Sequence, residues 1–219
     1  MVLGVLLILG AVALSWWNQK EDNDVQKAAV QIMPQLVQQI RENTVAETVG
    51  PQDAFVPELE LQKPVALLTE EDKKMTEVEI DGNLYIGYLS IPALNMELPI
   101  MSDWSYAQLQ IAPCRYHGSI RGEDLVLMAH NYRSHFGYIN RLEPGDQVIF
   151  TDMDGKTTVY TVVGQDILDP SAVEVITAGE YDLTLFTCTY AVPAGSPSIA
   201  MWPNKYPKPK KGRPSARLF

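Results

Sequence analysis

The chain has 219 residues, of which 46% are hydrophobic, enough for one ordinary core with appendages rather than for two full domains. Its formal net charge of −10 and the lack of a stripe of interleaved basic and aromatic residues argue against nucleic acid as a partner. The two cysteines, Cys114 and Cys188, show no metal-ligand spacing, so we expect no metal site, and a single disulfide between them is the alternative interpretation.

Residues 1–17 are predicted to form a membrane anchor. The run from Val2 to Trp17 is almost wholly apolar and ends in Ser15-Trp16-Trp17, which is typical of an aromatic edge at a membrane interface. A helix of about 16 residues spans roughly 24 Å, which is short for a bilayer core of about 30 Å. We therefore expect an uncleaved anchor whose true start lies upstream, with a signal peptide as the alternative.

Residues 18–80 are predicted to be a helical stalk followed by a linker. Between Asp24 and Arg41 apolar residues recur at helical spacing, and Pro34 is expected to kink or split that helix. Residues 43–80 mix Pro, Glu and Asp with little periodicity, which indicates a linker of low order.

Residues 81–190 are predicted to be the catalytic domain, a mostly β, closed or nearly closed barrel with short helices. Short apolar runs recur between turn signals and are read as strands at 84–92, 96–100, 125–130, 147–152, 157–165 and 183–188. The pair Asp154-Gly155 predicts a hairpin loop over 153–156, and 134–142 has room for one or two helical turns.

Two of these strands end in a reactive residue. The run that starts at Asp124 ends in Ala129-His130-Asn131, and the run that starts at Asp182 ends in Thr187-Cys188-Thr189. A largely apolar strand is buried, so a residue at its end lies at the rim of the barrel, rigidly held and open to substrate. A thiol beside an imidazole there can act as a nucleophile toward an acyl carbon. The spacing alone also fits a small buried Cys and a polar His cap.

The wider pattern resembles the sortase family. Thr184-Leu185-Phe186-Thr187-Cys188 is similar to the Thr-Leu-x-Thr-Cys signature of sortases, and Ala129-His130-Asn131 precedes it where those enzymes carry their His. The stretch from Tyr85 to Pro99 and the Gly145-Asp146 turn also resemble the family. Among the classes of sortase, the chain is most similar to the class D or class B-like enzymes of Gram-positive Firmicutes.

The resemblance implies a membrane-tethered, single-pass cysteine transpeptidase with an extracytoplasmic catalytic domain. Cys188 would attack the Thr–Gly bond of an LPxTG-like sorting signal and form a thioester, and an amine from a peptidoglycan precursor or a pilin would resolve it. His130 would be the general acid and base. The resemblance implies no cofactor and no metal, and it assigns no role to His117, His135 or Cys114, which we expect to be surface or structural residues.

Residues 191–219 depart from the family, which places an Arg on the strand after the Cys strand. Here a Pro-rich tail follows, with six basic and no acidic residues, and proline is hardly tolerated in a central strand. The last barrel strand is therefore expected to be missing or replaced, and no Arg stands at the matching position.

A frameshift is one explanation of this tail. Restoring a nucleotide after the Tyr190 codon permits the reading Tyr-Gly-Gly-Ser-Ser-Arg-Leu-Thr-Val, an alternating strand with a central Arg. The alternative is a genuine basic extension with Arg213 or Arg217 folding back. Because a missing Arg leaves activity open, two other functions remain: an inactive, membrane-anchored β-barrel binding module, and a convergent cell-wall cysteine peptidase.

Overall fold

The computed structural model of the protein describes residues 2–48, 68–169, 171–188 and 215–218. One long helix, α1 (Val2–Thr48), precedes the sheet, and the short helices are η2 (Pro92–Leu94), α2 (Tyr106–Leu109), η3 (Ile139–Arg141) and α3 (Val173–Ile176). The strands of the described part are β1 (Val78–Ile80), β2 (Asn83–Ile91), β3 (Met96–Met101), β4 (Cys114–His117), β5 (Leu125–Ala129), β6 (Gln147–Asp152), β7 (Thr157–Gln165), β8 (Leu183–Thr187) and β9 (Ser215–Leu218).

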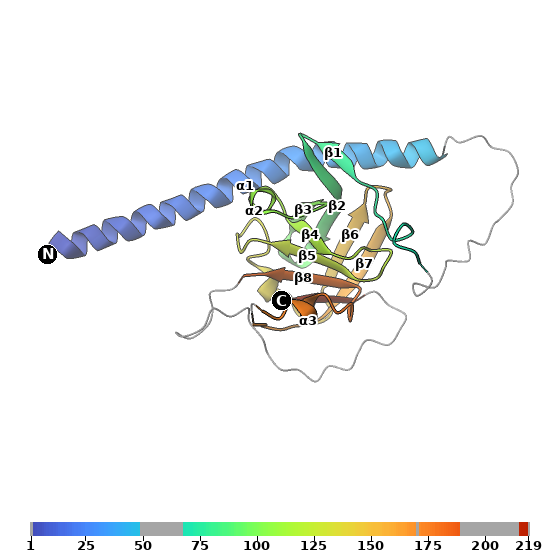
Figure 1. Ribbon diagram of the computed structural model, residues 1–219. Helices are drawn as coiled ribbons and strands as arrows, with labels where there is room; N and C mark the ends of the chain where they lie inside the picture. Colours follow the sequence, from blue (N-terminus) through green and yellow to red (C-terminus); the bar gives the residue numbers. More distant parts are fainter. Residues whose placement is uncertain (1, 49–67, 170, 189–214, 219) are drawn as a thin grey trace, which may run out of the picture.

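These strands form one sheet that curls into a barrel (Figure 1). Their order is β1-β2-β3-β4-β5-β8-β9-β7-β6, and the additional pairing of β2 with β6 joins the two sides of the sheet. The interior is filled by alternate strand residues that are almost fully buried, among them Ile86, Leu89, Leu127, Phe150 and Leu185. The predicted β-barrel with short helices is thereby confirmed.

The predicted strands agree closely with the observed ones, and the main omission is β4. The runs at 147–152 and 157–165 coincide with β6 and β7, and the hairpin loop between them is where Asp154-Gly155 predicted it. Cys114 was placed in a loop, but it starts β4, which pairs with β5 at Met128. β4 is only four residues long and includes Arg115 and His117, so it has too little apolar alternation to stand out in the sequence.

The prediction that Pro34 kinks or splits the helix is wrong in that α1 runs through it without interruption. Proline removes the N–H that would bond to the carbonyl of residue 30. Both Pro34 and Val30 are exposed, so water can take the place of the missing donor. The helix also extends beyond the predicted end of the stalk, to Thr48, and residues 49–67 of the expected linker lie outside the described residues.

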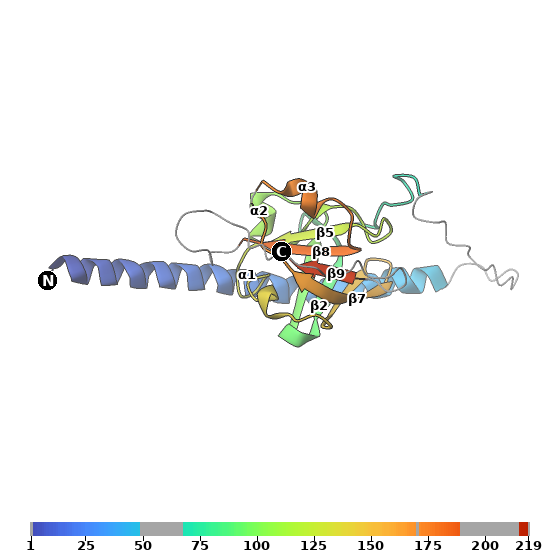
Figure 2. The ribbon, with the colours of Figure 1, turned by 90° about the horizontal axis from the view of Figure 1, so that it is seen from below.

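The first turns of α1 project away from the barrel (Figures 1 and 2), and their apolar side chains are exposed. Among the described residues, no helix combines the length and the apolar character needed to cross a membrane.

The middle of α1 packs against the outside of the barrel. Ile32, Leu36 and Ile40 are buried against Tyr85 and Met101 and complete a second hydrophobic cluster. The Asn43 side chain donates a hydrogen bond of 3.0 Å to the carbonyl of Met153. The predicted stalk is therefore part of the folded domain and not a spacer beside it.

Replacing Leu36, which is fully buried, with alanine is expected to lower the free energy of unfolding by about 2 to 5 kcal/mol, because it leaves a cavity between α1 and the sheet. Val37 is the next residue and is 39% exposed, so Val37→Ala is the matched control, with an expected loss below about 1 kcal/mol. Urea unfolding of the two variants measures the difference. Equal losses would show that α1 does not dock on the barrel.

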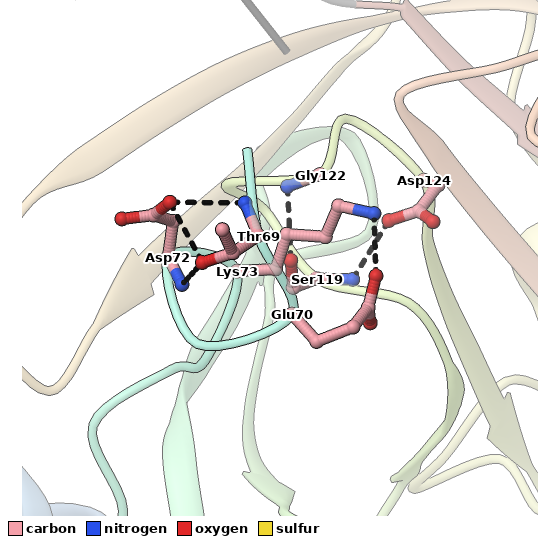
Figure 3. A network of polar contacts seen from close by, with 7 residues as sticks. All are labelled: Thr69, Glu70, Asp72, Lys73, Ser119, Gly122 and Asp124. Carbon is pink, nitrogen blue, oxygen red and sulfur yellow. Dashed lines mark hydrogen bonds and ion pairs between the residues drawn. The ribbon is translucent and has the colours of Figure 1, made fainter. Parts of the chain in front are cut away.

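A turn at 69–74 ties the chain to the barrel before β1 (Figure 3). Asp72 accepts hydrogen bonds from the Thr69 amide and hydroxyl, and Lys73 pairs with Glu70 at 3.0 Å. Asp124 lies opposite, where it accepts a bond from the Ser119 amide, and its charge contributes to raising the pKa of Lys73, after the larger effect of Glu70. The part of the predicted linker that follows residue 67 is therefore ordered against the 118–124 loop.

Candidate active site

The structure brings His130 and Cys188 to neighbouring positions at one end of the barrel. Strands β5 and β8 are parallel and in register from Leu125 opposite Leu183 to Ala129 opposite Thr187. His130 and Cys188 are the next residue on each strand. Because paired strands lie about 4.8 Å apart, the two side chains start from adjacent points on the rim.

A hydrogen bond closes the ladder just before these residues. The Thr187 hydroxyl donates to the carbonyl of Ala129 at 2.8 Å, which fixes the spacing of the two strand ends. Cys188 is exposed and His130 is half-buried, so the thiol is open to a substrate while the imidazole is held. The predicted catalytic pair thus stands on adjacent strand ends, and its catalytic role stays a prediction.

Cys114 is a different kind of thiol. Both cysteines are free, so the Cys114–Cys188 disulfide is not formed. Cys114 is fully buried and donates to the carbonyl of Ala112 at 3.4 Å. Its burial, with a smaller effect of the Asp103 charge, raises the pKa of the thiol to about 12. It is the packed thiol that the sequence predicted.

This difference predicts selective alkylation. At pH 8 a thiol with a pKa of about 12 carries about a thousandfold less thiolate than an ordinary one, and only the thiolate reacts. Iodoacetamide is therefore expected to modify Cys188 and to spare Cys114 in the folded protein, as read by peptide mass spectrometry, while both react in 8 M urea. Equal modification of the two in the folded protein would contradict the buried position of Cys114.

The strand after the Cys strand is replaced by β9, from the far end of the tail. It lies between β8 and β7 and is parallel to both, with Arg217 opposite Thr184. Thr184 precedes Cys188 by four residues, or about 13 Å along a strand. The register of β9 therefore sets the backbone of Arg217 away from the Cys188 end. The frameshift hypothesis concerns residues 191–219, of which 191–214 and 219 lie outside the described residues.

Three other described arginines already have partners. Arg115 donates to the Ser102 carbonyl and pairs with Glu77, Arg121 pairs with Asp154, and Arg141 stacks on the ring of Tyr138. None is assigned the role of the family's arginine. In the part of the chain that the structure describes, no cluster of His, Cys, Asp and Glu is suited to a metal ion.

An aromatic row leads away from the Cys188 end, and no pattern in the sequence predicted it. Phe186 lies two residues before Cys188, on the same side of β8. The ring centroids of Phe186 and Tyr116 are 5.2 Å apart. Those of Tyr116 and Trp104 are 5.7 Å apart, and those of Trp104 and Tyr106 are 6.2 Å apart. Phe186 is buried, whereas Trp104 is 42% and Tyr106 is 78% exposed. The row therefore runs from a buried ring two residues before Cys188 to exposed rings at Trp104 and Tyr106.

The fold is thus a barrel with a thiol and an imidazole on adjacent strand ends. A family model described as "Sortase domain" matches residues 89–198, half of the chain, and includes both His130 and Cys188. The chain belongs to the sortase family.

Solved structures similar to this chain are also sortases. A sortase C from Clostridium perfringens is 19% identical, with 85% of this chain and 93% of that one covered and a TM-score of 0.43. A Streptococcus pneumoniae sortase C is 19% identical, with 83% and 99% covered and a TM-score of 0.47. A pilus-related sortase C of Group B Streptococcus is 20% identical, with 59% and 72% covered and a TM-score of 0.44. No curated protein matches the chain.

The family assignment agrees with the resemblance found in the sequence, and its finer parts remain predictions. The similarity to class D or class B-like enzymes is not decided by these matches. The roles of Cys188 and His130 also stay predictions and are taken up in the proposed function below.

Proposed function

We propose that the protein is a cysteine transpeptidase that cleaves an LPxTG-like sorting signal and transfers the surface protein to an amine. The observation that carries this proposal is the placement of Cys188 and His130 on adjacent ends of the parallel strands β5 and β8. The exposed thiol is the nucleophile, and the half-buried imidazole is the proton carrier.

The reaction has two acyl transfers. His130 takes the proton of the Cys188 thiol, the sulfur attacks the carbonyl carbon of the signal threonine, the Thr–Gly C–N bond breaks, and His130 gives that proton to the leaving amine. The incoming amine then attacks the thioester, the C–S bond breaks, and His130 takes the amine's proton as the new amide forms. The aromatic row supports the proposal that the substrate contains proline, because proline rings pack well on aromatic side chains.

The acceptor is proposed to be an amine of a peptidoglycan precursor or a pilin, and the location to be the outer face of the cell membrane. Seven large apolar side chains in the first turns of α1 support the location, since each is more than half exposed: Val5, Leu7, Ile8, Leu9, Val12, Leu14 and Trp16. Sedimentation of the full chain with lipid vesicles tests it, and a chain that stays in the supernatant would contradict it.

The activity test uses a fluorescent LPxTG peptide with hydroxylamine as the acceptor amine. Formation of the threonine hydroxamate is the expected result, and a peptide with its Thr and Gly exchanged is the matched control. Cleavage of both peptides at similar rates would favour a general cysteine peptidase and would contradict the proposal.

A binding module without turnover is the second candidate. The parallel register of β9, which keeps the backbone of Arg217 away from the Cys188 end, favours it. Loss of one oxyanion-type donor typically slows an enzyme by about 10² to 10³-fold. Binding of the LPxTG peptide without any hydroxamate would support this candidate over the transpeptidase.

A further inference from the structure

The loop after β5 folds back on His130. The Phe136 amide donates to the carbonyl of His130 at 3.3 Å, so residues 131–135 form a compact turn at the strand end. Within it, the carbonyl of Tyr132 accepts hydrogen bonds from the His135 amide at 3.0 Å and from the Gly137 amide at 2.8 Å. Two hydrogen bonds therefore hold the backbone of Tyr132, which lies two residues after His130.

Gly137 makes this close packing possible. A Cβ atom at that position would lie 2.6 Å from the Tyr132 carbonyl oxygen and 2.8 Å from its carbon. Both contacts are with backbone, which cannot move aside as a flexible side chain can. The absence of a side chain at Gly137 thus lets the backbone of Tyr132 sit where its ring meets His130.

The ring of Tyr132 contacts two imidazoles. Its centroid is 4.9 Å from that of His130, with an interplanar angle of 43°, and 5.7 Å from that of His135, with an angle of 41°. His135 is fully buried, and so is the next residue, Phe136, which belongs to the barrel core. Tyr132 therefore contacts a fully buried side chain, His135, as well as the half-buried His130.

We propose that Tyr132 is a positioning residue that holds the His130 imidazole in the orientation needed to exchange protons with Cys188. This inference rests on the proposed function, because it concerns the same imidazole. A side chain at the end of a strand has few neighbours to select its rotamer, and the ring of Tyr132 removes part of that freedom. An imidazole held in this orientation can take the proton of the Cys188 thiol and give it to the leaving amine.

Three variants of the full chain separate this role from general packing. Tyr132→Leu removes the ring, and Tyr132→Phe keeps it. Tyr138→Leu is the matched control, because it removes a ring of the same loop that stacks on Arg141 instead. Thermal unfolding is recorded for each. If Tyr132→Leu does not fold, Tyr132→Met replaces it, since an unbranched side chain fills irregular space more easily.

Two readouts are needed. The first is turnover of the LPxTG peptide: kcat of Tyr132→Leu is expected to fall about 10- to 100-fold with little change in KM, while Tyr132→Phe and Tyr138→Leu stay within about threefold of the parent. The second requires no turnover: the ratio of Cys188 alkylation at pH 6 to that at pH 9 is expected to fall about tenfold in Tyr132→Leu alone, because the imidazole no longer assists the thiol.

The possible failures differ. If Tyr132→Leu keeps the parent's kcat and alkylation ratio while His130→Gln loses both, the positioning role is overturned and the transpeptidase assignment stands. If Tyr132→Phe falls as far as Tyr132→Leu, the hydroxyl rather than the ring matters, and the proposal fails as stated. Full activity in His130→Gln would overturn the positioning role and the proposed function together.

Discussion

Replacing Cys188 with alanine is expected to lower the rate of hydroxamate formation from the LPxTG peptide by at least about a thousandfold. The thiol forms the covalent intermediate, and no other group at the strand end can take its place. Because Cys188 is exposed at the rim and not part of the core, the variant should fold with an unchanged thermal midpoint. It should also bind the peptide with an affinity close to that of the parent.

Cys114→Ala provides the comparison for this variant. Cys114 is buried in the cluster that packs under α1, so its loss should affect stability and leave the rate per folded molecule unchanged. Stopped assays on both variants, with peptide binding followed by fluorescence anisotropy, give the two rates. A Cys188→Ala protein that still forms hydroxamate would remove the thiol from the mechanism.

Replacing His130 with glutamine is expected to reduce kcat by about 10² to 10⁴-fold, the usual contribution of a general acid and base. The amide is similar in size to the imidazole but cannot exchange a proton near neutral pH. The loss should be greatest for substrates with poor leaving groups, because His130 protonates the departing amine. A peptide thioester in place of the amide should recover part of the rate.

The buried His135 is the control for His130. It lies in the same loop but has no exposed surface, so His135→Gln should act on thermal stability and not on the dependence of rate on leaving group. Measured with the amide and the thioester peptide, the two histidine variants should therefore separate. An equal rate loss for both peptides in His130→Gln would argue that His130 does not protonate the leaving group.

Much of the barrel could be predicted because the composition of its strands is typical of β-structure. β6 and β7 are long, rich in strand formers and joined by an Asp-Gly turn, and their limits were predicted to the residue. The positions of His130 and Cys188 at strand ends also followed from two apolar runs. Which strands are neighbours did not follow, since β5 and β8 are more than fifty residues apart in the chain.

The contacts that depend on tertiary packing could not be predicted. Helical spacing in α1 showed an apolar face at Ile32, Leu36 and Ile40 but not that the barrel covers it. The aromatic row joins residues from β4 and β8, which come together only because β5 lies between them. Tyr132 stands two residues after His130, and only the turn closed by Gly137 brings their rings into contact.

The tail is the opposite case. The sequence argument concerned the residues that follow Tyr190, whereas the structure describes residues 215–218 of the tail. Proline content predicted that the strand after Cys188 is missing or replaced, and β9 does take a place beside β8. Its parallel direction was not predicted, because a four-residue run such as 215–218 carries no signal of its direction or partner.

The most direct test of the central claim is mass spectrometry of the full chain quenched in acid during turnover of an LPxTG peptide. The proposed mechanism predicts that the acyl fragment ending in threonine is attached to the tryptic peptide that contains Cys188, and that hydroxylamine releases it. An adduct on Cys114, or cleaved peptide with no adduct at any time under conditions where the thioester should accumulate, would contradict a Cys188 acyl-enzyme.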